Sequence, residues 1–366
     1  MHIQTSKVVL FQQIQRCQNI VEKRNTNPIL TNIHFETIEQ DLKLTATDLQ
    51  ATFSSTQAVK VIQQGSFIVD AKKIFDIVRE LNPDFEIELK LVDTFLNIVS
   101  GGVQFKLATL SPDTFPREPE DETDLTINIA GAELSRLISS TSFAMSTDET
   151  RKYLTGSLFE ITAEHGMRVV TTDGHRMALR DFHLDGQSDD GLSIVPKKAV
   201  LEIKRLADEC EGEIRLSLGE NQIRVELKQQ RFTSKVIDAK YPVYDDVIPK
   251  NNPYTAIMDK STLDQALRRC MVVANDFTHD VKLHFSNNTL NIAAHNTEQE
   301  QAHEDMVIEY EGLDIEIGFN AKYMREVLNA VQSQRVRFQL KDSLSPALLL
   351  EESHDFSKHV LMPMRI

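Results

Sequence analysis

The chain repeats itself with a period near 125 residues, and this repetition limits its possible folds more than any other feature. Thr47–Asp48 is echoed by Thr172–Asp173 at an offset of 125 (172 − 47), and His295–Asn296 follows after 123 more (295 − 172). Three lysines that each precede an amphipathic stretch recur in the same way, at Lys73, Lys198 and Lys322. Their offsets are 125 (198 − 73) and 124 (322 − 198). Two independent elements with one period indicate three copies of one structural unit.

Each copy predicts the same order of elements. Apolar residues at steps of 4, 3 and 4 predict an opening helix with one buried face, at Leu10, Ile14, Cys17 and Val21 and again at Leu263, Leu267, Cys270 and Ala274. The middle copy has a shorter set at Leu134, Leu137 and Ile138. Alternating stretches such as 42–46 and 169–171 then predict strands of a half-buried sheet. A second amphipathic helix closes each copy, with apolar residues at Ile74, Ile77, Val78 and Leu81 and at Met324, Val327, Leu328 and Val331. Asp70 and Asn320 are expected to cap such helices, and Pro196 suits a first helical turn.

Two stretches rich in proline and charge separate the copies, at 112–124 and 245–253. We therefore predict an α+β fold of three repeated domains, 1–124, 125–250 and 251–366, each with two helices packed on one face of an antiparallel sheet. A chain of 366 residues is too long for one ordinary core, which agrees with this division.

The net charge is −15, from 55 acidic and 40 basic residues. This charge argues against broad electrostatic adhesion to nucleic acid or to an anionic membrane, so any DNA contact should be local. No apolar run approaches the roughly 18 residues of a membrane span, and no signal peptide is apparent, so we expect a cytoplasmic protein. The three cysteines lie far apart, at Cys17, Cys210 and Cys270, which favours buried thiols over a disulfide framework or a zinc site.

Familiar catalytic signatures for phosphate, dinucleotide, zinc or nucleophilic-serine chemistry are missing from the sequence. Residues 185–191 resemble a calcium loop, but Pro196 stands where a bidentate glutamate is needed, so an acidic surface turn is favoured. His175 with Asp173 could form a general base held by a carboxylate, and a hydrolase is the alternative function. The Thr-Asp frame recurs at 47–48 without a histidine, which instead favours a strand end entering a turn at Gly174, with Asp173 bonding local amides.

Positive charge gathers on the second helix of every copy, at Lys72, Lys73, Arg79, Lys197, Lys198, Lys204, Arg205, Lys322 and Arg325. One such helix would be an ordinary solvated face, whereas three equivalent helices suggest a shared surface that faces a polyanion. The missing base-reading motifs favour contact with the nucleic-acid backbone alone. A protein scaffold without a DNA role remains a third hypothesis.

The final stretch, 359–366, alternates so that Val360, Met362, Met364 and Ile366 share one face. Pro363 lacks an N–H group, so we expect this strand at an edge or end of its sheet. The methionines could close the core or provide a surface that adapts to several peptides.

These features together resemble the bacterial DNA polymerase III beta subunit, the sliding clamp family, over the whole chain. Besides the threefold repeat, the resemblance rests on short motifs at 27–30 (NPIL), 172–176 (TDGHR), 232–235 (FTSK), 241–244 (YPVY) and 360–366 (VLMPMRI). It implies a head-to-tail homodimeric ring of six similar domains, with helices around the hole and sheets outside. It further implies a DNA polymerase processivity factor without catalytic activity, cofactor or metal, which encircles duplex DNA and tethers the polymerase.

The resemblance also implies functional residues. The DNA-contact positions are Arg24, Lys72, Lys73, Tyr153, Lys197, Lys198 and Lys235. The peptide-binding groove positions are Leu154, Thr172, Gly174, His175, Arg176, Met177, Pro242, Val247, Asn320, Tyr323, Val360, Met362, Pro363, Met364 and Arg365. The dimer interface positions are Phe105 and Leu107 against Val272 and Val273, with Glu298, Glu300 and Glu304 on the acidic side.

The partners that the resemblance implies are a second copy, the clamp loader, the DNA polymerase III alpha subunit, translesion polymerases, mismatch-repair proteins and ligase. Two departures from the family pattern bear on them. Asp245 and Asp246 stand where relatives often have arginines, so the groove rim is more acidic. Gly102 and Gln104 stand where basic residues are common, so burial is expected to contribute more to the interface than charge pairing.

Overall fold

A computed structural model of the chain describes residues 1–21, 27–116, 125–184 and 189–365. The candidate DNA contact Arg24, part of the stretch 112–124, most of the suspected calcium loop and Ile366 lie outside these residues. The chain forms two compact units, one of residues 1–130 with 212–236 and one of residues 131–211 with 237–366. Each unit holds two antiparallel sheets.

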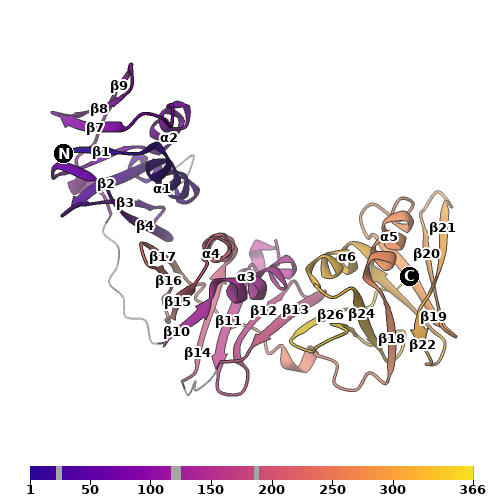
Figure 1. The fold of residues 1–366 in the computed structure, drawn as a ribbon. Coiled ribbons are helices and arrows are strands. Elements are labelled where there is room, and N and C mark those ends of the chain that lie inside the picture. Colours follow the sequence, from indigo (N-terminus) through magenta and orange to yellow (C-terminus); the bar gives the residue numbers. More distant parts are fainter. Residues whose placement is uncertain (22–26, 117–124, 185–188, 366) are drawn as a thin grey trace. The chain divides into compact units, whose positions relative to one another are not determined.

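The first unit contains helices α1 (Lys7–Ile20) and α2 (Ala71–Glu80), which pack against each other (Figure 1). Its five-stranded sheet has the order β5 (Lys60–Gln63), β1 (His2–Thr5), β7 (Ile87–Val92), β8 (Phe95–Ser100) and β9 (Val103–Ala108). Its eight-stranded sheet has the order β10 (Leu125–Ala130), β15 (Glu213–Leu218), β16 (Gln222–Leu227), β17 (Gln230–Lys235), β4 (Ala51–Ala58), β3 (Asp41–Thr47), β2 (Asn32–Ile38) and β6 (Ser66–Asp70).

The second unit contains the packed helix pairs α3 (Gly131–Ser139) with α4 (Lys197–Asp208) and α5 (Lys260–Cys270) with α6 (Ala321–Ala330). Its nine-stranded sheet has the order β14 (Gly191–Pro196), β11 (Gly156–Thr162), β12 (Gly166–Thr172), β13 (Arg176–Phe182), β26 (Ser357–Leu361), β25 (Ala347–Glu351), β24 (Arg335–Leu340), β18 (Tyr254–Asp259) and β22 (Glu309–Tyr310). Its four-stranded sheet has the order β21 (Gln301–Val307), β20 (Thr289–His295), β19 (Asp280–Ser286) and β23 (Ile315–Asn320).

The predicted helix faces are confirmed for most residues, because nearly all the apolar residues at helical spacing are buried; Val21 and Ile77 are half-buried. On α5, for example, Leu263, Leu267 and Cys270 are at most 1% exposed, whereas Ala274 lies beyond the end of the helix. The predicted caps also form: Asp70 Oδ1 accepts from the Lys73 amide at 2.7 Å. Pro196 is the exception, since it precedes α4 as its cap residue and is not in the first turn.

The two large sheets join strands from different repeats. In the first unit β4 pairs with β17, and in the second unit β13 pairs with β26. The predicted α+β class with paired helices and antiparallel strands is confirmed. The sequence did not predict that the sheets continue from one repeat into the next. A pairing between strands so far apart in the chain leaves no local pattern in the sequence.

Two expectations about strands were wrong. The tail strand β26 lies between β13 and β25 in the middle of its sheet, because it ends at Leu361 and Pro363 takes no place in it. Strand β12 is buried on both faces, not half-buried, because Tyr241 and Tyr244 cover the side that carries Val170.

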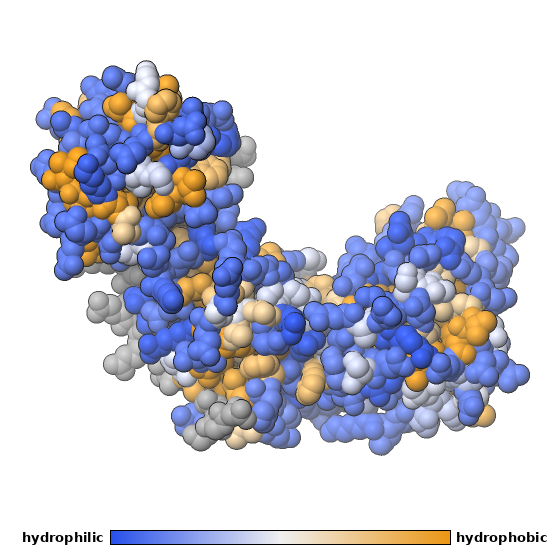
Figure 2. Space-filling model, viewed as in Figure 1, coloured by the Kyte–Doolittle hydropathy of each residue, from blue (hydrophilic) through white to orange (hydrophobic). Residues whose placement is uncertain are grey.

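No helix among the described ranges is long and apolar enough to cross a membrane. Hydrophilic residues cover most of the face visible in Figure 2, with smaller hydrophobic patches between them.

Candidate functional site

The turn between β12 and β13 is held by bonds from side chains to the backbone. Thr172 Oγ1 accepts from the Gly174 amide at 3.1 Å and donates to the Arg176 carbonyl at 2.6 Å. Oδ1 of Asp173 accepts from the amides of His175 at 2.9 Å and Arg176 at 3.1 Å. Gly174 has φ +91°, a left-handed conformation that glycine adopts without strain.

The first repeat builds the same turn without a histidine. Thr47 Oγ1 accepts from the Leu49 amide at 3.1 Å and donates to the Ala51 carbonyl at 3.0 Å. Asp48 Oδ1 accepts from the amides of Gln50 at 2.9 Å and Ala51 at 2.6 Å. The prediction that the Thr-Asp frame bonds local amides is therefore confirmed. The frame forms equally well where no imidazole follows, so the turn alone accounts for the bonds that the aspartate accepts from the backbone.

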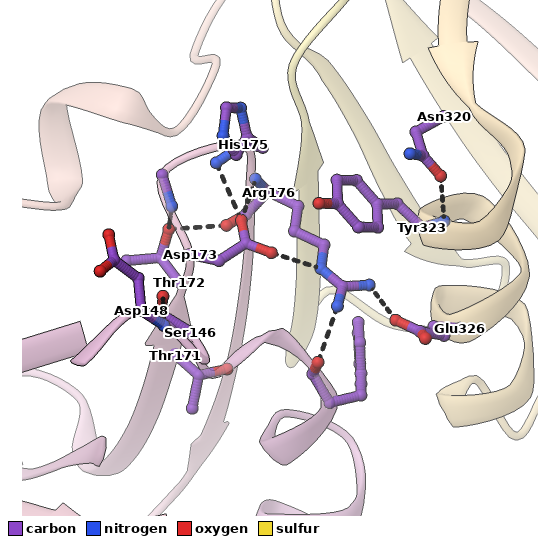
Figure 3. A network of polar contacts seen from close by, with 12 residues as sticks. Ser146, Asp148, Thr171, Thr172, Asp173, His175, Arg176, Asn320, Tyr323 and Glu326 are labelled. Carbon is purple, nitrogen blue, oxygen red and sulfur yellow. Dashed lines mark hydrogen bonds and ion pairs between the residues drawn. The ribbon is translucent and has the colours of Figure 1, made fainter. Parts of the chain in front are cut away.

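Arg176 connects this turn to the third repeat (Figure 3). Its Nε donates to Asp173 Oδ2 at 3.1 Å, its Nη2 to the Phe143 carbonyl at 2.8 Å, and its Nη1 to Glu326 on α6. The guanidinium carbon lies 4.1 Å from the centroid of the Tyr323 ring, a cation–π contact. The Arg176 side chain is only 7% exposed. Its contacts with Asp173 and Tyr323 link the turn to α6.

The tail lies directly beside the turn. The Met362 amide donates to the His175 carbonyl at 3.0 Å, immediately after the pairing of β26 with β13 ends. Two residues further on, the Met364 amide donates to the Gly318 carbonyl at 2.8 Å. Asn320 then caps α6 by accepting from the Tyr323 amide at 3.0 Å. The turn, the tail and the start of α6 therefore adjoin.

A buried apolar cluster lies against this part of the nine-stranded sheet. We call it the floor cluster; it comprises Leu158, Val170, Met177, Leu179, Ile194, Tyr241, Tyr244, Leu348, Leu350 and Val360. Val247, from the connector between the second and third repeats, packs against it. The predicted groove residues Met177 and Val360 are therefore members of one cluster, and the predicted groove residue Val247 lies beside it.

A network of polar side chains anchors the connector, through Tyr244, to the strands beneath the floor cluster. Arg168 Nη2 donates to Asp181 Oδ2 at 2.9 Å, and its Nη1 reaches the Tyr244 hydroxyl at 3.4 Å. The Tyr244 hydroxyl in turn donates to Glu160. Burial raises the pKa of Tyr244, so the hydroxyl stays protonated as this donation requires. Asp245, one of the acidic departures, has Oδ1 3.5 Å from Arg168 Nη1 and so has a cationic neighbour.

The fifteen predicted groove residues differ in exposure. Leu154, Arg176, Met177 and Val360 are buried; Thr172, Val247, Asn320, Tyr323, Met362, Pro363 and Met364 are half-buried; Gly174, His175, Pro242 and Arg365 are exposed. Val247 and Met362 also line a cavity of about 550 Å³ next to the connector.

Comparison with known proteins agrees with this geometry. Family models of the DNA polymerase III beta subunit match the chain three times: the N-terminal domain at residues 1–119, the central domain at 128–243 and the C-terminal domain at 245–365. The chain belongs to the DNA polymerase III beta subunit family.

Individual relatives support the assignment. The beta sliding clamp of Pseudomonas putida is 36% identical over 368 residues, covering 100% of both chains. A crystal structure of the DNA polymerase III subunit beta from Pseudomonas aeruginosa has a TM-score of 0.97 at 36% identity, with 100% of both chains covered. A second structure from that organism, bound to griselimycin, has the same TM-score of 0.97, identity of 36% and coverage of 100% on both sides.

The candidate DNA contacts of this clamp-family chain are mostly exposed. Lys72 and Lys73 lie in the first turn of α2, Lys197 and Lys198 in the first turn of α4, and Lys235 at the end of β17, all exposed. Tyr153 is half-buried and packs on the floor cluster. Four other basic residues of the second helices pair with carboxylates, namely Arg79, Lys204, Arg205 and Arg325. These carboxylates offset part of the positive charge on the second helices.

Three of the seven candidate interface residues lie on edge strands, and the other four lie in loops. Phe105 and Leu107 are half-buried on β9, which ends the five-stranded sheet of the first unit. In the second unit Glu304 lies on the edge strand β21 and pairs with Arg269 at 2.8 Å. Val272 follows α5 and is 82% exposed. Val273 is half-buried, while Glu298 and Glu300 are exposed between β20 and β21.

Sequence reasoning missed the residues that support the site. Glu326 and Phe143 hold Arg176, and Arg168 with Asp181 and Glu160 holds the connector. The pairing of Arg168 with Asp181 could have been predicted from the sequence. A hairpin centred on Gly174 that pairs Thr172 with Met177 also places Arg168 opposite Asp181.

Proposed function

We propose that the chain is a DNA polymerase processivity factor. Two copies form a head-to-tail ring that encircles duplex DNA without reading its sequence and tethers polymerases through the groove. The observation that carries this proposal is the full-length similarity to sliding clamps, matched by three family models. A ring holds DNA topologically, so it needs only a sparse basic lining. That suits a chain with a net charge of −15.

The proposed DNA contacts are Arg24, Lys72, Lys73, Tyr153, Lys197, Lys198 and Lys235. Their role is weak attraction to phosphates, which permits sliding. The exposure of the lysines supports this role, because their side chains can reach phosphates and phosphate contacts carry no sequence information.

The fifteen groove residues are proposed to bind a short peptide from each partner. The turn, the tail and the connector lie close together beside the floor cluster, and this supports the proposal. Val247 of the connector and Met362 of the tail provide half-buried apolar side chains that a peptide can contact. The exposed His175 at the rim would orient the peptide. The proposed partners are the clamp loader, the polymerase III alpha subunit, translesion polymerases, mismatch-repair proteins and ligase.

We further propose that the protein has no catalytic activity and works in the cytoplasm. The use of both Asp173 oxygens by backbone amides and Arg176 supports the first point. The proposed domain limits are 1–124, 125–250 and 251–366. Head-to-tail pairing would join the β9 edge of one copy to the β21 edge of the next, through Phe105 and Leu107 against Val272 and Val273.

Retention on DNA tests the ring. The protein is loaded onto nicked circular DNA with a clamp loader, isolated by gel filtration, and the DNA is then linearised. Loss of the protein on linearisation is expected, whereas equal retention on circular and linear DNA would refute topological binding.

A His175→Ala variant tests the groove. It should keep its dimeric mass in light scattering and lose capture of partner peptide. The hydrolase alternative predicts the reverse, with peptide capture intact and a small-molecule turnover lost.

A further inference from the structure

We propose that the cavity beside the groove binds an acidic side chain of the partner peptide, adjacent to the segment that occupies the groove. This inference rests on the proposed groove and adds a subsite to it. The cavity has a volume of about 550 Å³ and lies within the second unit. Its lining includes the connector residues Asp246 and Lys250, then Lys341 and Pro346 before β25, and Met362 of the tail.

The walls of this cavity are tied together before any ligand arrives. Asn252 Nδ2 donates to the carbonyl of Gln339 at 2.9 Å and to that of Pro346 at 3.0 Å, which joins the connector to β24 and to the loop before β25. Asp342 Oδ1 holds that loop by accepting from the amides of Leu344 at 2.9 Å and Ser345 at 2.7 Å. A ligand would therefore meet a formed site and would not have to order a mobile one.

The charges of the lining favour an anion. Its charged residues are Lys250, Lys341 and Asp246, all exposed, so the two cations outnumber the one anion. The neighbouring carboxylates are engaged elsewhere: Asp245 lies 3.5 Å from Arg168, and Asp342 bonds its own loop. The bonds to that loop also lower the pKa of Asp342. In a chain with a net charge of −15, a local excess of positive charge at a cavity selects an acidic partner.

The cavity is continuous with the groove. Val247 packs on the floor cluster and also lines the cavity. Met362 lines the cavity as well, while its amide is bonded to His175 at the groove rim. A peptide in contact with both residues would therefore bring a flanking side chain to the lysines.

Matched peptides test the proposal. An array of overlapping peptides from the polymerase III alpha subunit first identifies a segment that the wild-type protein binds. This segment is then synthesised with Asp or Asn at each flanking position, because the two side chains have the same shape and differ in charge. Fluorescence anisotropy gives Kd for each peptide with the wild type and with Lys250→Glu, Lys341→Glu and Asp246→Asn. Lys228→Glu, an exposed lysine of the first unit, is the control for the same change in net charge.

At one flanking position Asp should bind more tightly than Asn to the wild type. Each lysine variant should reduce this preference by about two- to fivefold, as expected for a partly exposed ion pair. Asp246→Asn should increase it, and Lys228→Glu should leave it unchanged. A preference that is absent, or that is the same in the wild type and both lysine variants, overturns the cavity proposal even if His175→Ala still weakens binding. If the wild type binds no segment of the array, the groove proposal itself fails.

Discussion

We expect His359 to make the stability of the second unit depend on pH. Its side chain is fully buried on β26, where it lies opposite Ala178 of β13 and Leu349 of β25. The Phe143 ring lies 5.9 Å away, centroid to centroid. Within the described part of the chain, neither ring nitrogen has a hydrogen-bond partner. Burial, with a contribution from the positive charge of Arg180, lowers the pKa of His359 from 6.5 to about 3.

The folded state therefore keeps this imidazole neutral, while the unfolded chain takes up a proton below the ordinary pKa. A lowered folded pKa means that the full stability is present above pH 6.5 and is lost as the pH falls from there towards about 3. Between pH 7 and pH 5 the loss from this single group is about 2 kcal/mol. A His359→Leu variant lacks the titrating group and should not show this part of the loss.

Urea unfolding followed by circular dichroism at pH 7, 6 and 5 measures the difference. Carboxylates that titrate in both proteins cancel when the wild type is compared with His359→Leu, and the exposed His295→Leu serves as the control. We expect the wild type and the control to lose about 2 kcal/mol more than His359→Leu on going from pH 7 to pH 5. Equal losses in all three proteins would refute the assignment of a neutral, buried His359.

Three further outcomes are expected. Lys198→Glu should weaken direct DNA binding in gel shifts while light scattering still reports a dimer; a monomer would mean that this lysine serves the interface. Asp70→Ala should destabilise the first unit by about 1 kcal/mol in urea unfolding because α2 loses its cap, and Asp70→Ser, which keeps an acceptor, should recover most of this. Tyr244→Phe should cost about 1 to 2 kcal/mol in urea unfolding, because Glu160 and Arg168 lose the hydroxyl between them, and an unchanged midpoint would contradict the anchoring role.

The sequence predicted what depends on neighbouring residues. The helix faces follow from spacing alone, and the caps at Asp70 and Asn320 act over three residues. The Thr-Asp turn was predicted because the frame recurs at Thr47–Asp48 without a histidine, and the copy at Asp48 forms the same bonds to local amides. Each of these features is decided within one turn of chain, so repetition was enough to reveal it.

Long-range partners were not predictable in this way. Nothing local marks Glu326 as the partner of Arg176, since the two residues meet only when β13 and α6 have packed. The tail misled for a related reason: Pro363 was taken to place its strand at an edge, but the strand ends at Leu361, before the proline, and takes a central position. The order of strands in the nine-stranded sheet is a property of tertiary pairing, and no period in the sequence encodes it.

The pairing of β13 with β26 has a consequence for synthesis of the protein. Arg176 of β13 pairs with Leu361 of β26, which is synthesised 185 residues later (361 − 176). Until then β13 presents an open hydrogen-bonding edge, and an unpaired edge can recruit strands from other nascent chains. Contacts of such long sequence separation also form slowly. We expect the middle repeat to be the part of the newborn chain most dependent on chaperones, although its own residues are translated well before the third repeat.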